Sequence, residues 1–281
     1  MEAEGLNRKK LEEVARQIRC DVLRMIHQAG SGHPGGSLSI VDILVVLYYE
    51  VMRIDPNNPR WEDRDRLILS KGHACPALYA VLARRGYFEL EHLSTLRRFG
   101  SMLQGHPDSK RTPGIEISTG SLGQGLSVGV GMALGARLAG KHHRVYVLLG
   151  DGECDEGQVW EAALSAAHYK LDNLIAIVDD NGVQLDGPVK AVMDLGLLAN
   201  KWEAFGWDVA TVDGHSFSAL IDCFNRPNSA GRPRAVIART VKGRGVSFME
   251  GRHEWHGGSP TDEQLRAALQ EIMGEDSARQ D

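Results

Sequence analysis

The sequence lacks several features that would place it in a special class of protein. Its four cysteines, Cys20, Cys75, Cys154 and Cys223, form no CxxC pair. No apolar run reaches the roughly 18–20 residues that a membrane span needs. The N-terminal stretch MEAEGLNRKKLEEVARQIR is charged and has no signal-peptide core. We therefore expect free thiols in a reducing compartment, no membrane contact and a cytoplasmic protein.

An excess of positive charge is also missing. The chain has 32 Lys and Arg against 37 Asp and Glu, a net charge of -5, with both signs mixed along its 281 residues. This composition disfavours binding to nucleic acid through its phosphates. No internal repeat, low-complexity segment or linker divides the chain, so we expect one domain over residues 1–281. Glycine, in contrast, is abundant at 32 residues, which indicates tight turns or close backbone approaches.

Short aliphatic runs alternate with helical patterns through most of the chain. Strands are expected at 67–70, 144–150, 174–180, 207–213 and 234–241. Helices are expected at 7–29, 38–52, 74–86, 90–99, 121–140, 157–170, 194–205, 216–225 and after the capping box TDEQ at 261–264. Residues 100–120 are expected to form an extended loop, and the final GEDSARQD to fray. Strands separated by helices predict an α/β fold, a doubly wound and mostly parallel sheet flanked by helices.

The expected helix at 121–140 is unusual because it is rich in small residues. Glycine inside a helix costs about 1 kcal/mol relative to alanine. Several glycines in one helix therefore indicate that another group, a cofactor or a subunit, approaches its backbone closely.

Polar clusters follow two of the expected strands. GDGE places Asp151 after the strand 144–150, and DDNGV places Asn181 after the strand 174–180. Ligands of open α/β sheets bind at the carboxyl ends of strands, so we expect the two side chains to be neighbours. A carboxylate and an amide oxygen suit Mg²⁺ or Ca²⁺, with phosphate oxygens completing the shell. The alternative is that both clusters are solvated turns that cap their strands.

Four of the eleven histidines lie in glycine-rich contexts: SGHPGG (His33), KGHA (His73), QGHPD (His106) and EWHGG (His256). Each could be an ordinary loop residue. Four together suggest one site, where imidazole groups shuttle protons and donate hydrogen bonds to hydroxyls or oxyanions. A zinc site is the rival interpretation, although Asp151 and Asn181 already account for a different metal.

The spacing from GDG to Asn181 resembles that of enzymes that use thiamine diphosphate. That resemblance implies that Asp151 and Asn181 bind Mg²⁺ (or Ca²⁺ as a substitute) through their side chains, and Val183 through its backbone carbonyl. The histidine contexts, with STGSLGQGLS, GDGECDEG and DDNG, resemble transketolase. This resemblance extends from the first helix to TVKGRGVSF.

The transketolase resemblance implies a role for each matching residue. His33, His73, His106 and His256 would contact the reactive end of the cofactor or the sugar, with His33 and His256 handling the developing alkoxide or its proton. His256 is preferred to His253 because the family motif is a histidine followed directly by glycine. Glu156 would join a carboxylate network across a subunit interface. The cofactor-binding set would comprise His73, Gly120, Ser121, Leu122, Gly150, Asp151, Gly152, Glu153, Asn181 and His256.

The resemblance covers only the diphosphate-binding domain of the long transketolases. The pyrimidine-binding domain, which carries the activating glutamate, is not in this sequence. The resemblance therefore implies one subunit of a split enzyme, completed by a second polypeptide as an α₂β₂ assembly. Its expected reaction is the transfer of a two-carbon glycolyl unit from a ketose phosphate to an aldose, as in pentose phosphate metabolism.

Three alternatives remain open. The first is the α subunit of a thiamine-dependent 2-oxo acid dehydrogenase, which has no need of SGHPG, KGHA and GHPD together. The second is a variant that transfers the two-carbon unit to a specialised acceptor, such as a carrier-bound thiol or an unusual sugar phosphate. The third is a cofactor-binding module without activity, against which the intact Asp151, Asn181 and histidines argue.

Overall fold

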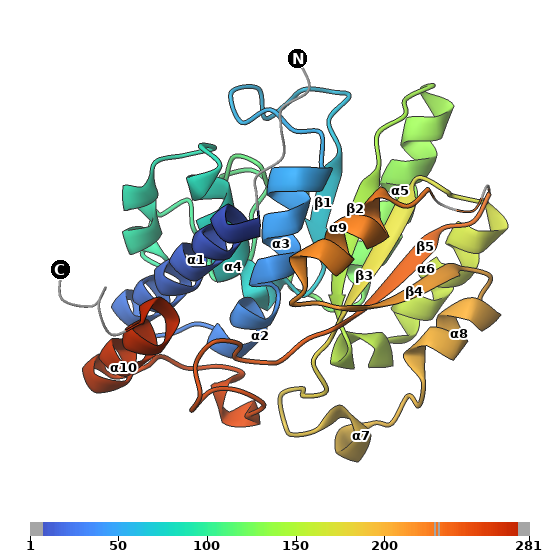
Figure 1. The fold of residues 1–281 in the computed structure, drawn as a ribbon. Helices are drawn as coiled ribbons and strands as arrows, with labels where there is room; N and C mark the ends of the chain where they lie inside the picture. Colours follow the sequence, from blue (N-terminus) through green and yellow to red (C-terminus); the bar gives the residue numbers. More distant parts are fainter. Residues whose placement is uncertain (1–7, 228, 230, 275–281) are drawn as a thin grey trace.

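The fold is built on a five-stranded sheet, seen in the computed structural model, which describes residues 8–227, 229 and 231–274 (Figure 1). The strands are β1 (Arg66–Leu69), β2 (Val145–Gly150), β3 (Leu174–Asp180), β4 (Asp208–Asp213) and β5 (Arg234–Arg239). They pair in parallel in the order β1-β2-β3-β5-β4. The predicted α/β class and parallel sheet are confirmed.

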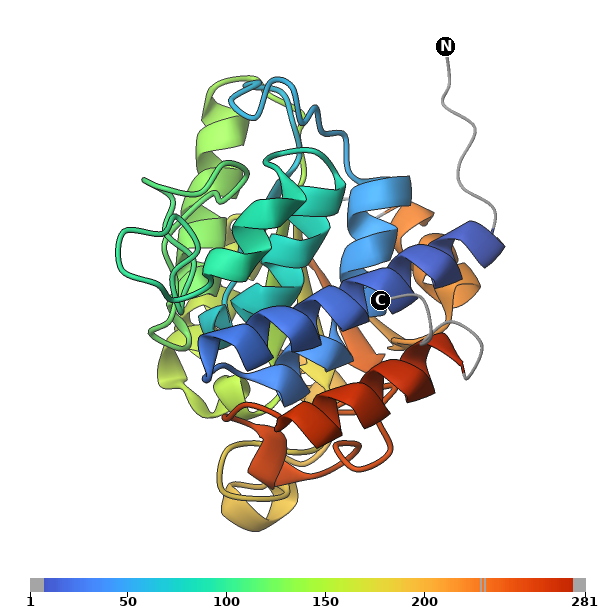
Figure 2. The ribbon, with the colours of Figure 1, turned by 90° about the vertical axis from the view of Figure 1, so that its left-hand side faces the viewer.

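Helices cover both faces of the sheet, as the aliphatic character of the strands predicts. One face packs against α1 (Arg8–Ala29), α2 (Pro34–Ser39), α3 (Val41–Val46), α4 (Cys75–Arg84) and α9 (Phe217–Asn225), with α10 (Asp262–Met273) lying along α1 (Figures 1 and 2). The other face packs against α5 (Gln124–Leu138), α6 (Gly157–His168) and α8 (Leu198–Ala204). Successive side chains of β2 alternate between the two cores: Tyr146 joins the first and Val147 the second.

Short turns of helix connect these elements and carry several of the polar residues considered below. They are η1 (Leu47–Val51), η2 (Gly72–Ala74), η3 (Leu90–Thr95), η4 (Gly152–Asp155), η5 (His253–Trp255) and α7 (Val189–Val192), which was not predicted.

The expected single helix at 38–52 is wrong in its bounds. Two short helices meet at Ile40, and a π-helical turn follows, in which the Met52 amide donates to the Leu47 carbonyl at 2.8 Å. Residues 38–52 are apolar on all sides of the helix. The sequence therefore has no periodic polar face whose interruption would show where one helix ends and the next begins. The expected helix at 90–99 is only the turn η3, because Arg97 takes a left-handed conformation with φ of 61°.

The helix expected at 121–140 begins later, at Gln124. Gly123 stands before it with φ of 82°, a conformation that favours glycine. A side chain at Gly125 would clash with Ser70, and one at Gly129 would clash with Val147 of the sheet. These two glycines therefore let α5 lie close to the sheet, while a subunit or cofactor contact of this helix stays a prediction.

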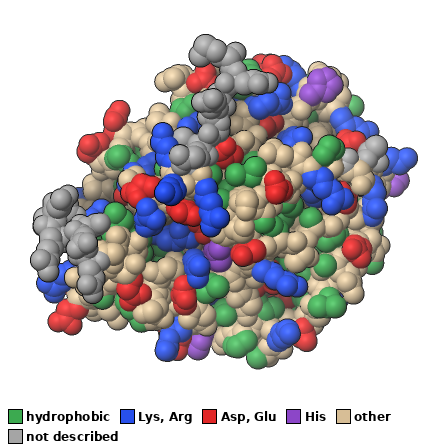
Figure 3. Space-filling model, in the orientation of Figure 1, with side chains coloured by type: hydrophobic (Ala, Val, Ile, Leu, Met, Phe, Trp, Pro, Cys, Tyr) green, Lys and Arg blue, Asp and Glu red, His purple; other side chains and the backbone are tan. Residues whose placement is uncertain are grey.

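Near the C-terminus the predicted capping box is confirmed, because the Gln264 amide donates to the Thr261 side chain and the Thr261 amide to the Gln264 side chain. The expected fraying at the end of the chain concerns residues 275–281, which lie outside the described residues. Helices in the described ranges are too short or too polar to cross a bilayer. Acidic and basic side chains are interspersed on the face seen in Figure 3.

Candidate functional site

Four neighbouring strands each deliver a polar residue to one edge of the sheet. Lys71 follows β1, Asp151 follows β2, Asn181 follows β3, and Lys242 lies three residues after β5. All four side chains line one cavity of about 160 Å³. The remaining lining residues are Gly36, His73, Leu122, Gly150, Gly152, Glu153, Val183, Gln184, Leu185 and His256. A larger cavity of about 520 Å³ lies between α1, α9 and α10, and it contains none of the predicted site residues.

Asp151 is almost fully buried, with 4% of its surface exposed. Its carboxylate accepts hydrogen bonds from the Gly152 amide at 2.8 Å and from the Gly182 amide at 2.6 Å. The second bond joins the loops after β2 and β3, so the predicted proximity of the two strand ends is confirmed. Burial, together with the charge of Asp179, raises the pKa of Asp151 to about 7. A cation beside Asp151 would offset both effects.

The loop after β3 supplies two further oxygen donors. The Asn181 side-chain oxygen accepts from the Val183 amide at 3.1 Å, and the Val183 carbonyl accepts from the Lys242 amino group at 3.0 Å. A carbonyl or amide oxygen has a second lone pair, which stays available for a metal. In the described part of the chain, no three His, Cys, Asp or Glu side chains are grouped as metal ligands. The donors here are instead one carboxylate, one amide and one backbone carbonyl, a hard-oxygen set that fits Mg²⁺.

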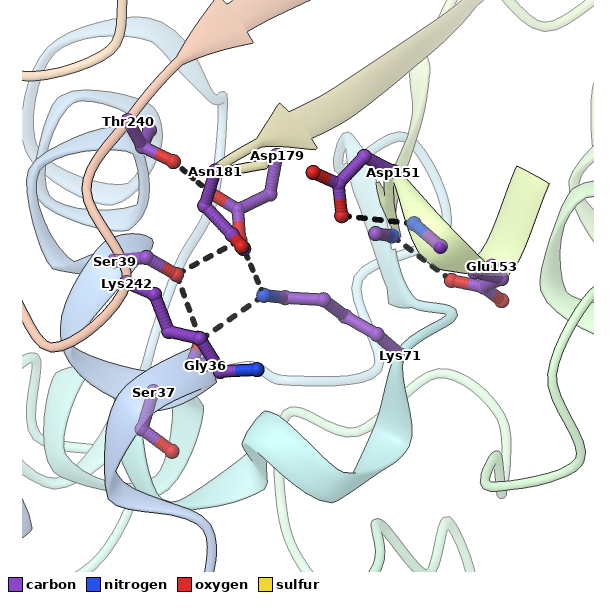
Figure 4. Close-up of polar contacts among 12 residues, drawn as sticks. Gly36, Ser37, Ser39, Lys71, Asp151, Glu153, Asp179, Asn181, Thr240 and Lys242 are labelled. Carbon is purple, nitrogen blue, oxygen red and sulfur yellow. Dashed lines mark hydrogen bonds and ion pairs between the residues drawn. The ribbon is translucent and has the colours of Figure 1, made fainter. Parts of the chain in front are cut away.

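Lys71 and Asp179 form a buried ion pair that the sequence analysis missed. The Lys71 amino group donates to Asp179 at 2.6 Å and to the Gly36 carbonyl at 3.0 Å (Figure 4). Asp179 also accepts from the side chains of Ser39, Asn181 and Thr240. Burial alone would raise the pKa of Asp179, but Lys71 and these hydrogen bonds hold it below its usual value. The pair thereby fixes Asn181, one of the predicted metal ligands, at its amide nitrogen.

Lys242 is the second buried lysine, with 2% of its surface exposed. Its amino group lies 3.0 Å from the Val183 carbonyl, 3.2 Å from the Gln184 carbonyl and 3.0 Å from His256 Nδ1. Burial and the like charge of Lys71 lower the pKa of Lys242 to about 8. In Figure 4 the two lysine side chains extend toward each other from opposite sides, and that of Lys71 ends at Asp179 and the Gly36 carbonyl. Because Asp179 neutralises Lys71, Lys242 is the lysine of this cavity that has no carboxylate partner among the described residues, and its charge favours an anion there.

The four predicted histidines form one cluster, and two of them, His73 and His256, line this cavity. Ring centroids lie 5.2 Å apart for His33 and His73, 5.0 Å for His73 and His256, and 5.6 Å for His33 and His256. His106 lies 6.4 Å from His33. His253 instead is exposed, and its ring lies 3.5 Å from the Glu254 carboxylate. Of the two candidates, His256 is therefore the one that joins the cluster.

Glycines and a buried tyrosine position these rings. A side chain at Gly120, whose φ is 143°, would lie 2.9 Å from the His106 ring, so only glycine leaves space there. The Tyr79 hydroxyl contacts the Gln104 carbonyl at 2.9 Å and the His106 carbonyl at 3.0 Å, which ties the His106 loop to α4. Gly120 and Tyr79 thus fix the position of His106 beside the other rings.

The environment of the histidines keeps them neutral. Burial lowers the pKa of His33 and of His256 to about 4 and that of His73 to about 2, with nearby cations adding to the effect. Burial and Arg97 also lower the pKa of His106. At neutral pH these groups are therefore uncharged imidazoles, which favours the predicted donation of hydrogen bonds over the predicted shuttling of protons.

His73 should make the protein sensitive to acid. Its pKa is lower in the folded chain than the usual 6.5, so the unfolded chain binds the extra proton below pH 6.5. Between about pH 6.5 and 4.5, this one group should reduce the free energy of unfolding by up to about 1.4 kcal/mol per pH unit. His73→Gln should unfold in urea with a smaller loss of stability between pH 7 and pH 5 than the wild type. Equal losses in the two proteins would contradict this assignment.

The other predicted residues take varied places. Gly150, Gly152, Glu153 and Leu122 line the cavity, whereas Ser121 is exposed. Glu153 accepts from the Gly123 amide at 2.9 Å and the Gly150 amide at 3.0 Å, and from the Ser70 hydroxyl, so it also fastens β1, β2 and the start of α5 together. Glu156 is exposed beside Gly123, and its interface role stays a prediction.

Comparison with known proteins gives a consistent assignment. A family model described as the thiamine diphosphate binding domain of transketolase matches residues 10–280. The 6-deoxy-6-sulfo-D-fructose transketolase subunit SqwG of Clostridium sp. (strain MSTE9) is 47% identical over 94% of this chain and 97% of that protein. The chain belongs to the transketolase family. It is also similar to an apulose-4-phosphate transketolase subunit of Phocaeicola vulgatus, with 43% identity over 93% of each chain.

Longer transketolases match along part of their length. The human transketolase is 41% identical over 94% of this chain but only 42% of its own length. The crystal structure of the Campylobacter jejuni transketolase superposes with a TM-score of 0.90 and 35% identity, over 95% of this chain and 43% of that one. The chain therefore spans about two fifths of these transketolases and nearly all of the two relatives named as subunits. This favours the transketolase interpretation over the dehydrogenase alternative.

Proposed function

We propose that this chain, residues 1–281, is the diphosphate-binding subunit of a two-part transketolase. With thiamine diphosphate and Mg²⁺, the enzyme would transfer a two-carbon glycolyl unit from a ketose phosphate to an aldose acceptor. The observation that carries this proposal is the single cavity at the carboxyl edge of the sheet. Its lining combines oxygen donors, two lysines, His73 and His256, and the rings of His33 and His106 lie next to these two histidines.

The inner end of the cavity suits a metal-bound diphosphate. Asp151 and Asn181 would hold Mg²⁺ through their side chains and Val183 through its carbonyl, with Ca²⁺ as a substitute. The fit rests on the buried Asp151 carboxylate, which the described residues leave without a basic partner. Lys242 would offset part of the phosphate charge that the metal leaves, and Lys71, although paired with Asp179, could donate a hydrogen bond to a phosphate oxygen. Gly152 leaves room for this loop, because a side chain there would lie 2.8 Å from Gln184.

The outer end of the cavity suits the sugar. Thiamine diphosphate, when bound, supplies the carbon nucleophile and the electron sink for breaking a bond between two sugar carbons. Neutral His33 and His256 would donate hydrogen bonds to the oxygen on which charge develops. His73 and His106 would bind substrate hydroxyls or the cofactor.

A specialised sugar is the second candidate substrate. Two relatives of matching length are named for 6-deoxy-6-sulfo-D-fructose and for apulose-4-phosphate. These names favour a donor or acceptor outside the pentose phosphate sugars.

The proposed enzyme also needs a partner that carries the pyrimidine-binding domain, in an α₂β₂ heterotetramer. Two relatives named as subunits support this requirement. Glu156 and the exposed apolar residues of α5 and α6, Leu138 and Leu164, would lie at that interface. The four free cysteines support a cytoplasmic location.

Reconstitution tests the proposed function. The chain would be produced alone and together with the polypeptide encoded beside it, then assayed with thiamine diphosphate and Mg²⁺. Fructose 6-phosphate and 6-deoxy-6-sulfo-D-fructose would serve as alternative donors to an aldose phosphate. We expect transfer only when both chains are present. Transfer by this chain alone would contradict the two-part enzyme, and turnover of the sulfonated sugar alone would favour the specialised substrate.

A further inference from the structure

Arg97, the cation that helps to lower the pKa of His106, also contacts His33. The Arg97 guanidinium approaches the histidine cluster from the loop after η3. Its Nη2 lies 3.4 Å from His33 Nδ1, and its Nη1 lies 3.3 Å from the Ser31 hydroxyl. Among the described residues, no carboxylate pairs with this guanidinium. Arg97 therefore places its charge beside a neutral imidazole.

The backbone is shaped to hold Arg97 there. Its φ of 61° lies in the left-handed region, which is unfavourable for a residue with a side chain, and its amide donates to the Leu103 carbonyl at 2.8 Å. Gly105 leaves the guanidinium its space, because a side chain at Gly105 would lie 3.1 Å from Arg97 Nε. The backbone conformation of Arg97 and the absence of a side chain at Gly105 thus both favour the contact between Arg97 and His33.

The contact with Arg97 determines which ring nitrogen of His33 carries the proton. A guanidinium only donates hydrogen bonds, so the Nδ1 atom of His33 must accept. His33 then carries its proton on Nε2, and protonation of Nδ1 would break the contact. Histidines oriented by a carboxylate are stabilised as imidazolium, whereas a cation stabilises the neutral ring.

The same arrangement occurs a second time in the cluster. The Lys242 amino group lies 3.0 Å from His256 Nδ1, and an ammonium group also only donates. The groups that face His33 are Arg97, Lys242 and the rings of His73, His106 and His256, so no acidic group among them favours the imidazolium.

We propose that Arg97 is a positioning residue, which locks His33 as a neutral imidazole with its proton on Nε2, as a fixed hydrogen-bond donor. The catalytic consequence rests on the proposed function, whereas the tautomer itself does not. In this assignment His33 stabilises oxygen charge by donation and does not carry protons between substrate and solvent.

Nitrogen NMR of the full-length chain tests the tautomer directly. Proton–nitrogen correlation spectra of histidine-labelled protein distinguish Nε2–H, Nδ1–H and imidazolium rings, with His33→Gln used for assignment. We expect the Nε2–H form of His33 at pH 7 in the wild type. Arg97→Met should populate Nδ1–H and shift the formation of imidazolium to higher pH, and Arg97→Lys should retain the Nε2–H form.

Two further variants separate this role from a general effect on folding. Gly105→Ala should displace the guanidinium and reproduce the Arg97→Met spectrum without changing any charge. Arg98→Met removes the adjacent exposed arginine and should leave the His33 signals unchanged. An Nε2–H tautomer that persists in both Arg97→Met and Gly105→Ala overturns the proposal, whether or not the enzyme has transketolase activity.

Kinetics of the two-chain enzyme provide the second readout. Arg97→Met should lower kcat about 10-fold and leave the sugar KM within about twofold, because the lost interaction acts mainly in the transition state. Arg97→Lys should restore most of kcat. A rise in KM for anionic sugars with unchanged kcat would instead make Arg97 a substrate ligand and contradict the positioning role.

Discussion

Asp151→Asn should abolish the Mg²⁺-dependent binding of thiamine diphosphate and leave the fold intact. The substitution keeps the size of the side chain but removes the only carboxylate among the three proposed metal ligands. Loss of a group that merely orients a metal ligand costs 10–100-fold in affinity, so loss of this ligand should cost about 100-fold or more. Isothermal titration of the wild type and the variant with the Mg²⁺–cofactor complex measures the difference.

The folded state of Asp151→Asn should stay close to the wild type in stability, because two effects oppose each other. The variant loses the hydrogen bond from either the Gly152 or the Gly182 amide, since asparagine accepts through one oxygen only, but it also loses a buried charge. Burial and the charge of Asp179 make the ionised form of Asp151 unfavourable and raise its pKa to about 7. A neutral amide removes that unfavourable charge. Asp180→Asn is the matched control, because it removes the same charge from a side chain outside the cavity lining. Unchanged cofactor binding by Asp151→Asn, with a normal urea unfolding curve, would refute the metal assignment.

Lys71→Met should cause the largest loss of stability. It leaves Asp179 fully buried without its cation, and breaking a buried ion pair in this way typically costs about 3–5 kcal/mol. Asp179→Asn alone should also destabilise the fold, because it leaves Lys71 buried and unpaired. The double variant should lose less stability than the two single variants together. Urea unfolding of the four proteins gives this coupling.

An exposed pair of the same type provides the control. Lys141 and Asp63 lie 2.8 Å apart on the surface, and Lys141→Met should change the unfolding free energy little, since water screens that interaction. If Lys71→Met were as stable as Lys141→Met, the network around Asp179 would not hold the strand ends together.

The sheet and the metal loop, meaning the segments after β2 and β3 that carry Asp151, Asn181 and Val183, could be predicted from the sequence for a physical reason. Strands buried on both faces read as aliphatic runs, and polar residues directly after them mark the edge where ligands bind. Asp151 and Asn181 could therefore be placed together although 30 positions separate them. The histidines could be grouped by their glycine-rich contexts and by the resemblance, but no rule of local spacing brings His33 to His256.

The residues that the sequence analysis missed are partners of residues that it found. Lys71 lies in the quoted motif KGHA and Lys242 in TVKGRG, but each pairs with groups far away along the chain. Asp179 was placed in the polar cluster at the end of the expected strand 174–180 and received no role, because nothing nearby shows that a lysine 108 positions earlier neutralises it. A lysine directly after an aliphatic strand was the available signal, since burial there demands a charged partner. Nothing in the sequence indicated the left-handed backbone conformation of Arg97 or its contact with His33.

The central claim is that the metal loop and the histidine cluster are two ends of one cofactor site. A crystal structure of the two-chain enzyme with thiamine diphosphate and Mn²⁺ in place of Mg²⁺ tests this claim most directly, because Mn²⁺ can be located by its anomalous scattering. We predict one peak bounded by the Asp151 and Asn181 side chains and the Val183 carbonyl, with a diphosphate between Lys71 and Lys242. The other end of the cofactor should face His33 and His256. A peak elsewhere, or a cofactor that avoids the histidines, would contradict the account.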